Sequence, residues 1–306
     1  MKNFWKRAGW FVLLITLALG SAGFLEAKEI DVAYNALPFN LPSIVERTYG
    51  FFAQEGYDVR YHSFGAGYAM SEAMAAGNLD IAPVMGATSI IIAAAGGRNI
   101  KIIGGYSQAP AAFGLAVRPD TLSIGDLLGK KIAVPIGTEA HLLLGRILAE
   151  EGLTPCDVQL INLLIPDGIA ALRAGQVDAA MVVEPIMSRL SQSGSIVILR
   201  DGDGLISGLT LSVTTTDLAE SAPIEAFKRA HARSLEYLDS NCEQVLELAS
   251  SALNLPAEIV EMVAQKYVFR VELTEKQRAE LEETIEFLYG EGIIRQRIAL
   301  QDLFVD

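Results

Sequence analysis

Apolar and polar residues alternate along short segments of this chain, and helices that end at glycines separate these segments. Strands are predicted at 28–34, 57–64, 79–84 and 100–106, with a helix running to Gly56, a second closed by Gly77 and a third, apolar on all sides, near 88–97. Parallel strands need such crossover helices. The pattern therefore predicts an α/β fold with a parallel sheet.

The same layout occurs twice along the sequence. EGYDVRYHSF from Glu55 and SEAMAAGNLDIAPVMG from Ser71 are matched by EGLTPCDVQLINL from Glu151 and IAALRAGQVDAAMVVEP from Ile169. A repeated strand–helix unit predicts two similar α/β lobes with parallel-rich sheets. Small ligands bind in clefts between such units, so the repeat points to a binding site between lobes.

Two segments are predicted to cross between the lobes. They lie at 113–119 and 205–214, which places a two-segment hinge near Ala116 and near Gly208. The expected domains are residues 28–116 with 210–306, forming lobe I and the C-terminal helices, and residues 117–209, forming lobe II.

The first 27 residues are typical of a secretory signal. Lys2, Lys6 and Arg7 precede an apolar run of ten residues, 10–19, which small residues follow. Cleavage is expected after Ala22 or Ala27. The alternative is an uncleaved membrane anchor, but the apolar run is short against the ~20 residues that a span needs.

The charge of the chain argues against nucleic acid and anionic membranes as partners. The net charge is −13, and loss of residues 1–27 removes three positive charges and one negative charge, giving −15. Cys156 and Cys242 are the only cysteines, and an oxidising compartment would allow them to pair or to remain free.

Candidate ligand-binding residues lie where the predicted strands end and helices begin. Ligands of parallel sheets bind at the carboxyl ends of the strands, and a helix N-terminus supplies free N–H groups and partial positive charge for an anion. Each capping residue taken alone could also serve only its own helix. The predicted site comprises Asn35, Phe39, Gly65, Gly67, Gly86, Thr88, Ser89, Gly137, Thr138, His141, Asp167 and Glu184.

Two of these residues have open alternatives. His141, at the start of a helix, could donate to a ligand oxygen or pack on its own helix. Glu184, at the end of a buried strand, could receive an amine or hydroxyl of a ligand or pair with an internal arginine.

The motifs of the common enzyme and cofactor classes are missing. Gly65 and Gly67 suggest a dinucleotide loop, but Met70 stands where its third glycine would be. The three histidines are isolated and no GxSxG, HExxH or P-loop pattern is present. We therefore expect no cofactor, no metal and no enzymatic activity.

Several of these segments resemble a known family. IDVAY, GFFAQEGYDVRYHSFGAG, EAMAAGNLDIA and DLLGKKIAVPIGTEAHLLLGRILAEEGLTPCDVQLINL, with the later PDGIAAL and EP, are similar to periplasmic solute-binding proteins of ABC importers. The group is the one for aliphatic sulfonates, taurine, nitrate and thiamine-pyrimidine precursors. Members usually place an aromatic residue before the acidic-Pro pair, where this chain has Val183.

The resemblance implies a type II periplasmic-binding fold that closes on its ligand about the hinge. It further implies a monomer outside the cytoplasm that delivers its ligand to an ABC permease with its ATPase. An enzyme of the same fold acting on a small organic acid, or a ligand-sensing module for a receptor, is the competing interpretation. Sulfonate, nitrate, carboxylate and pyrimidine would all suit such a cleft.

Overall fold

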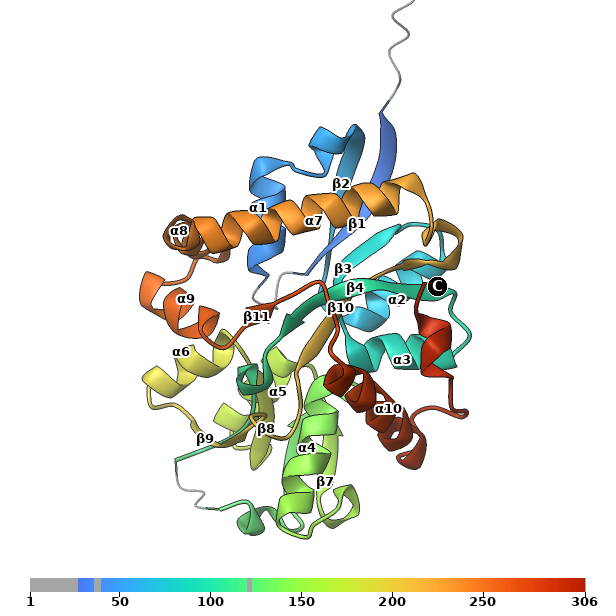
Figure 1. The fold of residues 1–306 in the computed structure, drawn as a ribbon. Helices are drawn as coiled ribbons and strands as arrows, with labels where there is room; N and C mark the ends of the chain where they lie inside the picture. Colours follow the sequence, from blue (N-terminus) through green and yellow to red (C-terminus); the bar gives the residue numbers. More distant parts are fainter. Residues whose placement is uncertain (1–26, 36–39, 120–122, 306) are drawn as a thin grey trace, which may run out of the picture.

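The computed structural model describes residues 27–35, 40–119 and 123–305 of the chain (Figure 1). Within them the strands form two sheets. The first has the spatial order β11 (Val268–Phe269), β4 (Ile100–Gln108), β10 (Leu209–Thr215), β3 (Ile81–Gly86), β1 (Lys28–Asn35), β2 (Tyr57–Phe64). The second has the order β7 (Gln159–Asn162), β6 (Lys131–Val134), β8 (Ala179–Val183), β5 (Phe113–Val117), β9 (Val197–Asp201).

Helices cover both faces of each sheet. They are α1 (Leu41–Tyr49), α2 (Gly67–Ala75), α3 (Ala87–Ala95), α4 (Glu139–Glu150), α5 (Ile165–Arg173), α6 (Ile186–Gln192), α7 (Ala222–Ser240), α8 (Cys242–Leu253), α9 (Ala257–Ala264) and α10 (Glu275–Gly290). None of these helices, in the part of the chain described, has both the length and the apolarity that a membrane span requires.

The predicted duplication is present in the sheet order. In the first sheet the order of the neighbours is β4-β10-β3-β1-β2, and in the second it is β9-β5-β8-β6-β7. If β1 to β4 and β6 to β9 are each counted as strands one to four, both sheets have the order four, three, one, two. In both, one further strand, β10 or β5, is inserted between strands four and three. The glycines that end the repeated segments, Gly56, Gly77, Gly152 and Gly175, have φ values of 95°, 72°, 70° and 70°. Glycine adopts this left-handed conformation without the penalty of a Cβ, so the repeat in sequence is also a repeat in backbone conformation.

The inserted strand of each sheet is the antiparallel member of an otherwise parallel-rich order. β10 pairs antiparallel with both β3 and β4, and β5 pairs antiparallel with both β8 and β9. Each inserted strand borders a crossing between the sheets, which is why it runs against its neighbours. The α/β fold with parallel-rich sheets is confirmed, since β1, β2 and β3 are parallel, as are β6, β7 and β8.

The two crossings contact each other. The N–H of Ala109 donates to the carbonyls of Ser207 and Gly208 over 3.1 and 3.3 Å. Gly208 has φ 58°, and a Cβ there would lie 2.5 Å from the carbonyl oxygen of Ala109. The first crossing lies at 109–112 and not near Ala116, because Ala116 pairs with Ala180 inside the second sheet. The chain returns to the first sheet between β9 and β10, at 202–208.

Burial follows the period-two alternation of the strands. Ile30 and Val32 of β1 pack under α7, whereas Ala33 belongs to the core beneath α2 and α3. In β5, Leu115 packs on the side of α4 and Ala116 on the side of α5. Alternate side chains point to opposite faces of a strand, so both faces of each sheet are buried.

The first helix is shorter than predicted. α1 ends at Tyr49, and Gly50, with φ 63°, caps it by donating to the carbonyl of Glu46 over 2.7 Å. A separate 3-10 turn, Ala53–Glu55, then leads to Gly56. Phe52, in the break between the two, is buried like the apolar residues of α1. The apolar periodicity therefore continues through the break, and it does not distinguish two short helical segments from one long helix.

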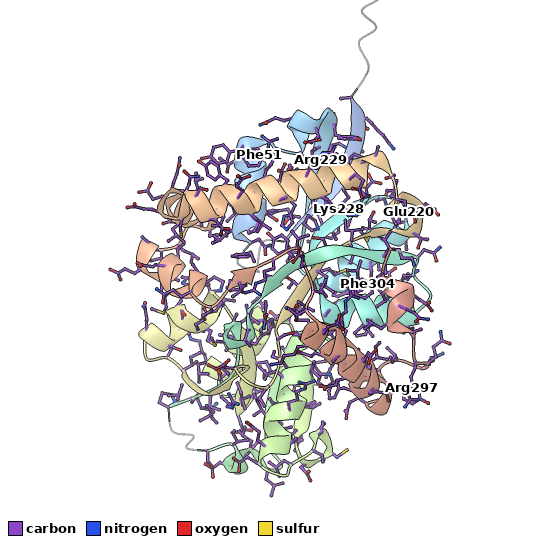
Figure 2. All side chains as sticks on the ribbon, viewed as in Figure 1. Phe51, Glu220, Lys228, Arg229, Arg297 and Phe304 are labelled. Carbon is purple, nitrogen blue, oxygen red and sulfur yellow. The ribbon has the colours of Figure 1, made fainter. Side chains whose placement is uncertain are left out.

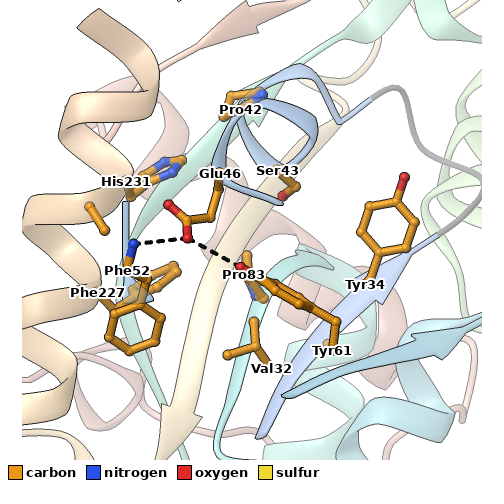
Figure 3. Close-up of a pocket in the computed structure, with 12 residues that line it drawn as sticks. Val32, Tyr34, Pro42, Ser43, Glu46, Phe52, Tyr61, Pro83, Phe227 and His231 are labelled. Atoms are coloured by element: carbon orange, nitrogen blue, oxygen red, sulfur yellow. Dashed lines mark hydrogen bonds between the residues drawn. The ribbon is translucent and has the colours of Figure 1, made fainter. Parts of the chain in front are cut away.

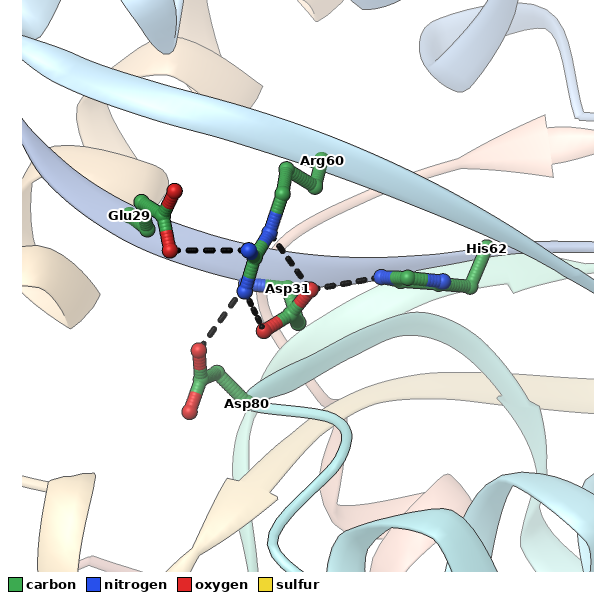
Figure 4. Close-up of polar contacts among 5 residues, drawn as sticks. All are labelled: Glu29, Asp31, Arg60, His62 and Asp80. Atoms are coloured by element: carbon green, nitrogen blue, oxygen red, sulfur yellow. Dashed lines mark hydrogen bonds and ion pairs between the residues drawn. The ribbon is translucent and has the colours of Figure 1, made fainter.

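Charged side chains form ion pairs at the β2 edge of the first sheet. On the edge strand β2, Arg60 and His62 both contact Asp31 of β1, at 2.6 and 2.5 Å, and Arg60 also reaches Glu29 at 2.8 Å (Figure 4). The Arg60 guanidinium holds the pKa of Asp31 below its usual range. Charge on an edge strand disfavours pairing with another sheet.

Candidate functional site

Three helix N-termini meet at the carboxyl ends of the strands. Gly67 begins α2, and a Cβ at this residue would lie 2.8 Å from both Cβ and Oγ of Ser89 in the first turn of α3. Gly137 precedes α4, and a Cβ there would lie 2.9 Å from Cδ1 of Ile92 in α3. The absence of a side chain at both glycines therefore allows α2 and α4 to approach α3.

A hydrogen bond joins α3 and α4 directly. The hydroxyl of Thr88 in the first turn of α3 donates to Oε2 of Glu139, the first residue of α4. Both side chains are buried, with 1% and 7% of each residue exposed. α3 follows β3 of the first sheet, and α4 follows β6 of the second sheet. This bond therefore links the two sheets at the predicted site.

The structure thus brings six of the predicted residues into one region. Gly86 and Thr138 are the N-cap residues of α3 and α4, and the hydroxyl of Thr138 donates to the carbonyl of Pro135 over 2.6 Å. The six residues are Gly67, Gly86, Thr88, Ser89, Gly137 and Thr138. Gly65 lies one residue before the N-cap of α2 and is exposed. Together the residues lie at helix N-termini, whose backbone N–H groups and partial positive charge suit an anion.

His141 packs inside the protein. Its Nδ1 accepts from the N–H of Gly137 over 3.4 Å, and its ring meets Phe287 of α10 edge to face with centroids 5.7 Å apart. Burial lowers the pKa of His141, so the ring is neutral. Its Nε2 is buried and has no hydrogen-bond partner among the described residues.

Glu184 is engaged within the protein. Its carboxylate accepts from the N–H of Ser188 over 3.1 Å, from the Ser188 hydroxyl over 2.8 Å, and from Nζ of Lys266, in the turn after α9. The internal cation is thus a lysine and not the arginine expected from sequence. Of the alternatives left open for this carboxylate, internal pairing is the one that the structure contains.

The remaining predicted residues are less well defined. Asp167 lies in the first turn of α5, which begins at Ile165, and it is exposed. The backbone of Asn35 pairs with Phe64 at the end of β1. Phe39 and the side chain of Asn35 lie outside the described residues.

Glu139 is the functional candidate that the sequence did not reveal. An acidic residue in the first turn of a helix is ordinary, because it complements the helix dipole. Only the tertiary contact with Thr88, 51 positions away, shows that Glu139 serves another helix. The pKa of Glu139 is raised to about 7, chiefly by burial and also by the charge of Glu280, while the hydroxyl and N–H of Thr88 and the charge of Arg146 act to lower it.

Several cavities in the described part of the chain lie away from these helix N-termini, and two of them adjoin the core or the crossings. One, of about 20 Å³, is lined by Glu46 and His231 among others (Figure 3). Oε1 of Glu46 accepts from Phe52 N–H and Tyr61, while its Oε2 points toward His231. This cavity has the size of a single water and is far below the ~300 Å³ of an organic-ligand pocket.

The second cavity, of about 400 Å³, lies beside the crossing between the sheets. Charged side chains of α4 and α10, including Arg146, Lys276 and Glu280, contribute to its wall. None of the predicted site residues lines it.

Comparison with known proteins identifies the family. The family model described as "NMT1/THI5 like" matches residues 39–244, which is more than half of the chain. The chain belongs to the NMT1/THI5-like family. The match includes α2, α3 and α4, whose N-termini form the candidate site.

Relatives of this NMT1/THI5-like protein include a binding protein of known name. This chain is 28% identical to the taurine-binding periplasmic protein of Escherichia coli K12 over 228 residues, which are 70% of this chain and 71% of the relative. Further curated relatives are matched over 44–64% of their own lengths.

Solved structures confirm the fold. The periplasmic aliphatic sulphonate binding protein SsuA of Escherichia coli has a TM-score of 0.80 at 21% identity, covering 91% of this chain and 92% of its own. The alkanesulfonate-binding protein SsuA of Xanthomonas axonopodis pv. citri, bound to MOPS, has a TM-score of 0.81 at 22% identity, with coverage of 92% and 99%. The chain therefore has the fold of periplasmic binding proteins, as its resemblance implied.

Proposed function

We propose that this protein is the extracytoplasmic solute-binding component of an ABC import system and captures a small anionic, sulfonate-like solute. The observation that carries the proposal is the meeting of the α2, α3 and α4 N-termini between the two sheets. Three helix N-termini in one place create positive potential without a side-chain cation. A sulfonate offers three oxygens to such donors.

The relatives support this choice of solute. The protein matched over most of its length is named for taurine, and the solved structures of like fold are named for aliphatic sulfonates. The two sheets joined by the paired crossings at 109–112 and 202–208 support closure about a hinge. We propose that residues 28–112 with 209–306 move as one lobe and residues 113–208 as the other.

A panel of small anions tests the proposed solute. Taurine, ethanesulfonate, nitrate, a short carboxylate and a pyrimidine are each added to the mature protein, with ethylamine as a control that lacks the acid. A ligand that binds only the native state raises the melting temperature, so we expect the sulfonates to raise it and ethylamine to leave it unchanged. Small-angle scattering with the bound ligand should give a smaller radius of gyration.

Two results would contradict the proposal. If no compound of the panel raises the melting temperature, the proposed solute class is wrong. If the radius of gyration is unchanged with saturating ligand, the proposed hinge closure is wrong. Recovery of the ligand chemically unchanged after incubation distinguishes binding from an enzyme of the same fold.

Export with cleavage is the second expectation of this function. Residues 1–26 lie outside those that the structure describes, and β1 begins at Lys28, directly after the expected signal. N-terminal sequencing of the exported protein should begin near Gly23 or Lys28. Protein that remains in the membrane fraction with Met1 intact would contradict cleavage.

A further inference from the structure

The N-terminus of α3 already holds an anion from the chain itself. The carboxylate of Glu139 comes from α4, after the second sheet, and accepts from the hydroxyl of Thr88 in the first turn of α3. The backbone N–H of Thr88 also bonds this carboxylate and lowers its pKa. Glu139 therefore occupies two of the donors at this helix N-terminus, the hydroxyl and the N–H of Thr88.

The groups around Glu139 leave its charge weakly compensated. Glu280 of α10 carries like charge and raises the pKa of Glu139, and Thr88 is its hydrogen-bond partner on α3. Arg146, on the same helix as Glu139, lowers that pKa, but its guanidinium donates to the carbonyl of Leu205 and to Glu283 at 3.2 Å. A buried carboxylate without a direct cation gains or loses its proton readily when a second charge arrives.

A solute anion at this position would meet the Glu139 carboxylate at close range. Two anions cannot share one set of N–H donors without strong repulsion, and protonation of one removes it. Protonated Glu139 becomes a hydrogen-bond donor, while the N–H groups at the start of α3 become available to the solute.

We propose that Glu139 determines the specificity of the anion site by occupying it, so that a solute anion binds with uptake of one proton by the Glu139 carboxylate. The inference rests on the proposed function, because it assumes that the solute binds at the α3 N-terminus. One proton from solvent forms the Glu139 O–H bond, and the solute keeps its charge. The site thereby rejects anions more strongly as the pH rises through neutrality.

Calorimetry with ethanesulfonate tests this on the mature protein. Affinity is measured at pH 6, 7 and 8 and, at pH 7, in Bis-Tris and in imidazole, two buffers without an oxyanion whose different ionisation enthalpies report proton uptake. For one coupled proton with a pKa of about 7, affinity should fall roughly tenfold from pH 6 to pH 8, with about half a proton taken up near pH 7. This measurement needs no variant.

The variant Glu139→Gln keeps the shape and the acceptor oxygen but carries no charge. It should bind ethanesulfonate as tightly at pH 8 as wild type does at pH 6, with no proton uptake. Glu151→Gln makes the same change at an exposed residue after the other end of α4 and should keep the wild-type pH dependence. Taurine, which carries an ammonium group that ethanesulfonate lacks, is measured in the same way, so that an effect of the ammonium can be separated from an effect of the sulfonate.

The outcomes separate this inference from the proposed function. Ethanesulfonate binding that is independent of pH and of Glu139→Gln would overturn the role of Glu139 and leave solute capture intact. Loss of taurine binding in Glu139→Gln, with pH-independent wild-type affinity, would also overturn it, because the carboxylate would then receive the ammonium. Failure of both sulfonates to bind wild type would overturn the proposed sulfonate solute and this inference together.

Discussion

Lys266→Met is expected to lower the free energy of unfolding by about 3 kcal/mol, the lower end of the range for removing one partner of a buried ion pair. The side chain of Glu184 is fully buried, and Nζ of Lys266 contacts its Oε1. Methionine fills the space of the lysine stem but leaves the carboxylate without its cation. The cost stays at the lower end because Ser188 still donates twice and because 25% of the Lys266 side chain is exposed.

The matched control is Lys228→Met on α7. Lys228 pairs with Glu225 at 2.9 Å on the outer surface, where the labelled Lys228 and Arg229 lie (Figure 2). Exposed pairs contribute less than about 1 kcal/mol, so this change should have little effect. Urea denaturation of both variants gives the comparison, and equal stability losses would show that Glu184 does not depend on Lys266. Adding Glu184→Gln to Lys266→Met should recover part of the loss, since no buried charge then remains.

The Glu184–Lys266 pair also illustrates what the sequence could not reveal. The residues are 82 positions apart, and each in isolation is an ordinary charged residue in the segment after a strand or a helix. Nothing in a local pattern encodes which distant element covers a carboxylate. The same holds for Thr88 and Glu139, which meet only because two separate sheets bring α3 and α4 together.

Local features were predictable because their physical causes are local. Glycines at the ends of repeated helices predict left-handed turns, and all four of those in the repeat have positive φ. Period-two alternation predicts strands buried on both faces. By contrast, β10 inserts between β3 and β4, although about a hundred residues separate it from either. A strand with no local partner carries no signal for its place in the sheet.

The helix N-termini stand between these two cases. The sequence identifies Gly86, Thr88, Gly137 and Thr138 as helix starts, because glycine and threonine are typical there. Their meeting depends on close packing, in which Ile92 of α3 occupies the space that a side chain at Gly137 would need. That these residues hold the ligand stays a prediction, and a backbone substitution addresses it most directly.

Gly137→Pro is expected to abolish ligand binding. Proline requires φ near −65°, whereas Gly137 has φ 76° and donates its N–H to His141. The loop must therefore change conformation, which displaces the N-terminus of α4 from α3 and removes a donor. Calorimetry with the best ligand of the panel, on variant protein that retains its circular dichroism spectrum, should detect no binding.

Two comparisons distinguish loss of the site from loss of stability. Gly152→Pro imposes the same conflict at φ 70°, but after the C-terminal end of α4. It should destabilise the fold to a similar extent and leave the affinity of the folded protein unchanged. Thr138→Ala removes a hydroxyl that donates to Pro135 and leaves the backbone N–H groups in place, so affinity should fall by no more than about 1 kcal/mol. Folded Gly137→Pro protein that binds as tightly as Gly152→Pro protein would show that the ligand lies elsewhere than at the α4 N-terminus.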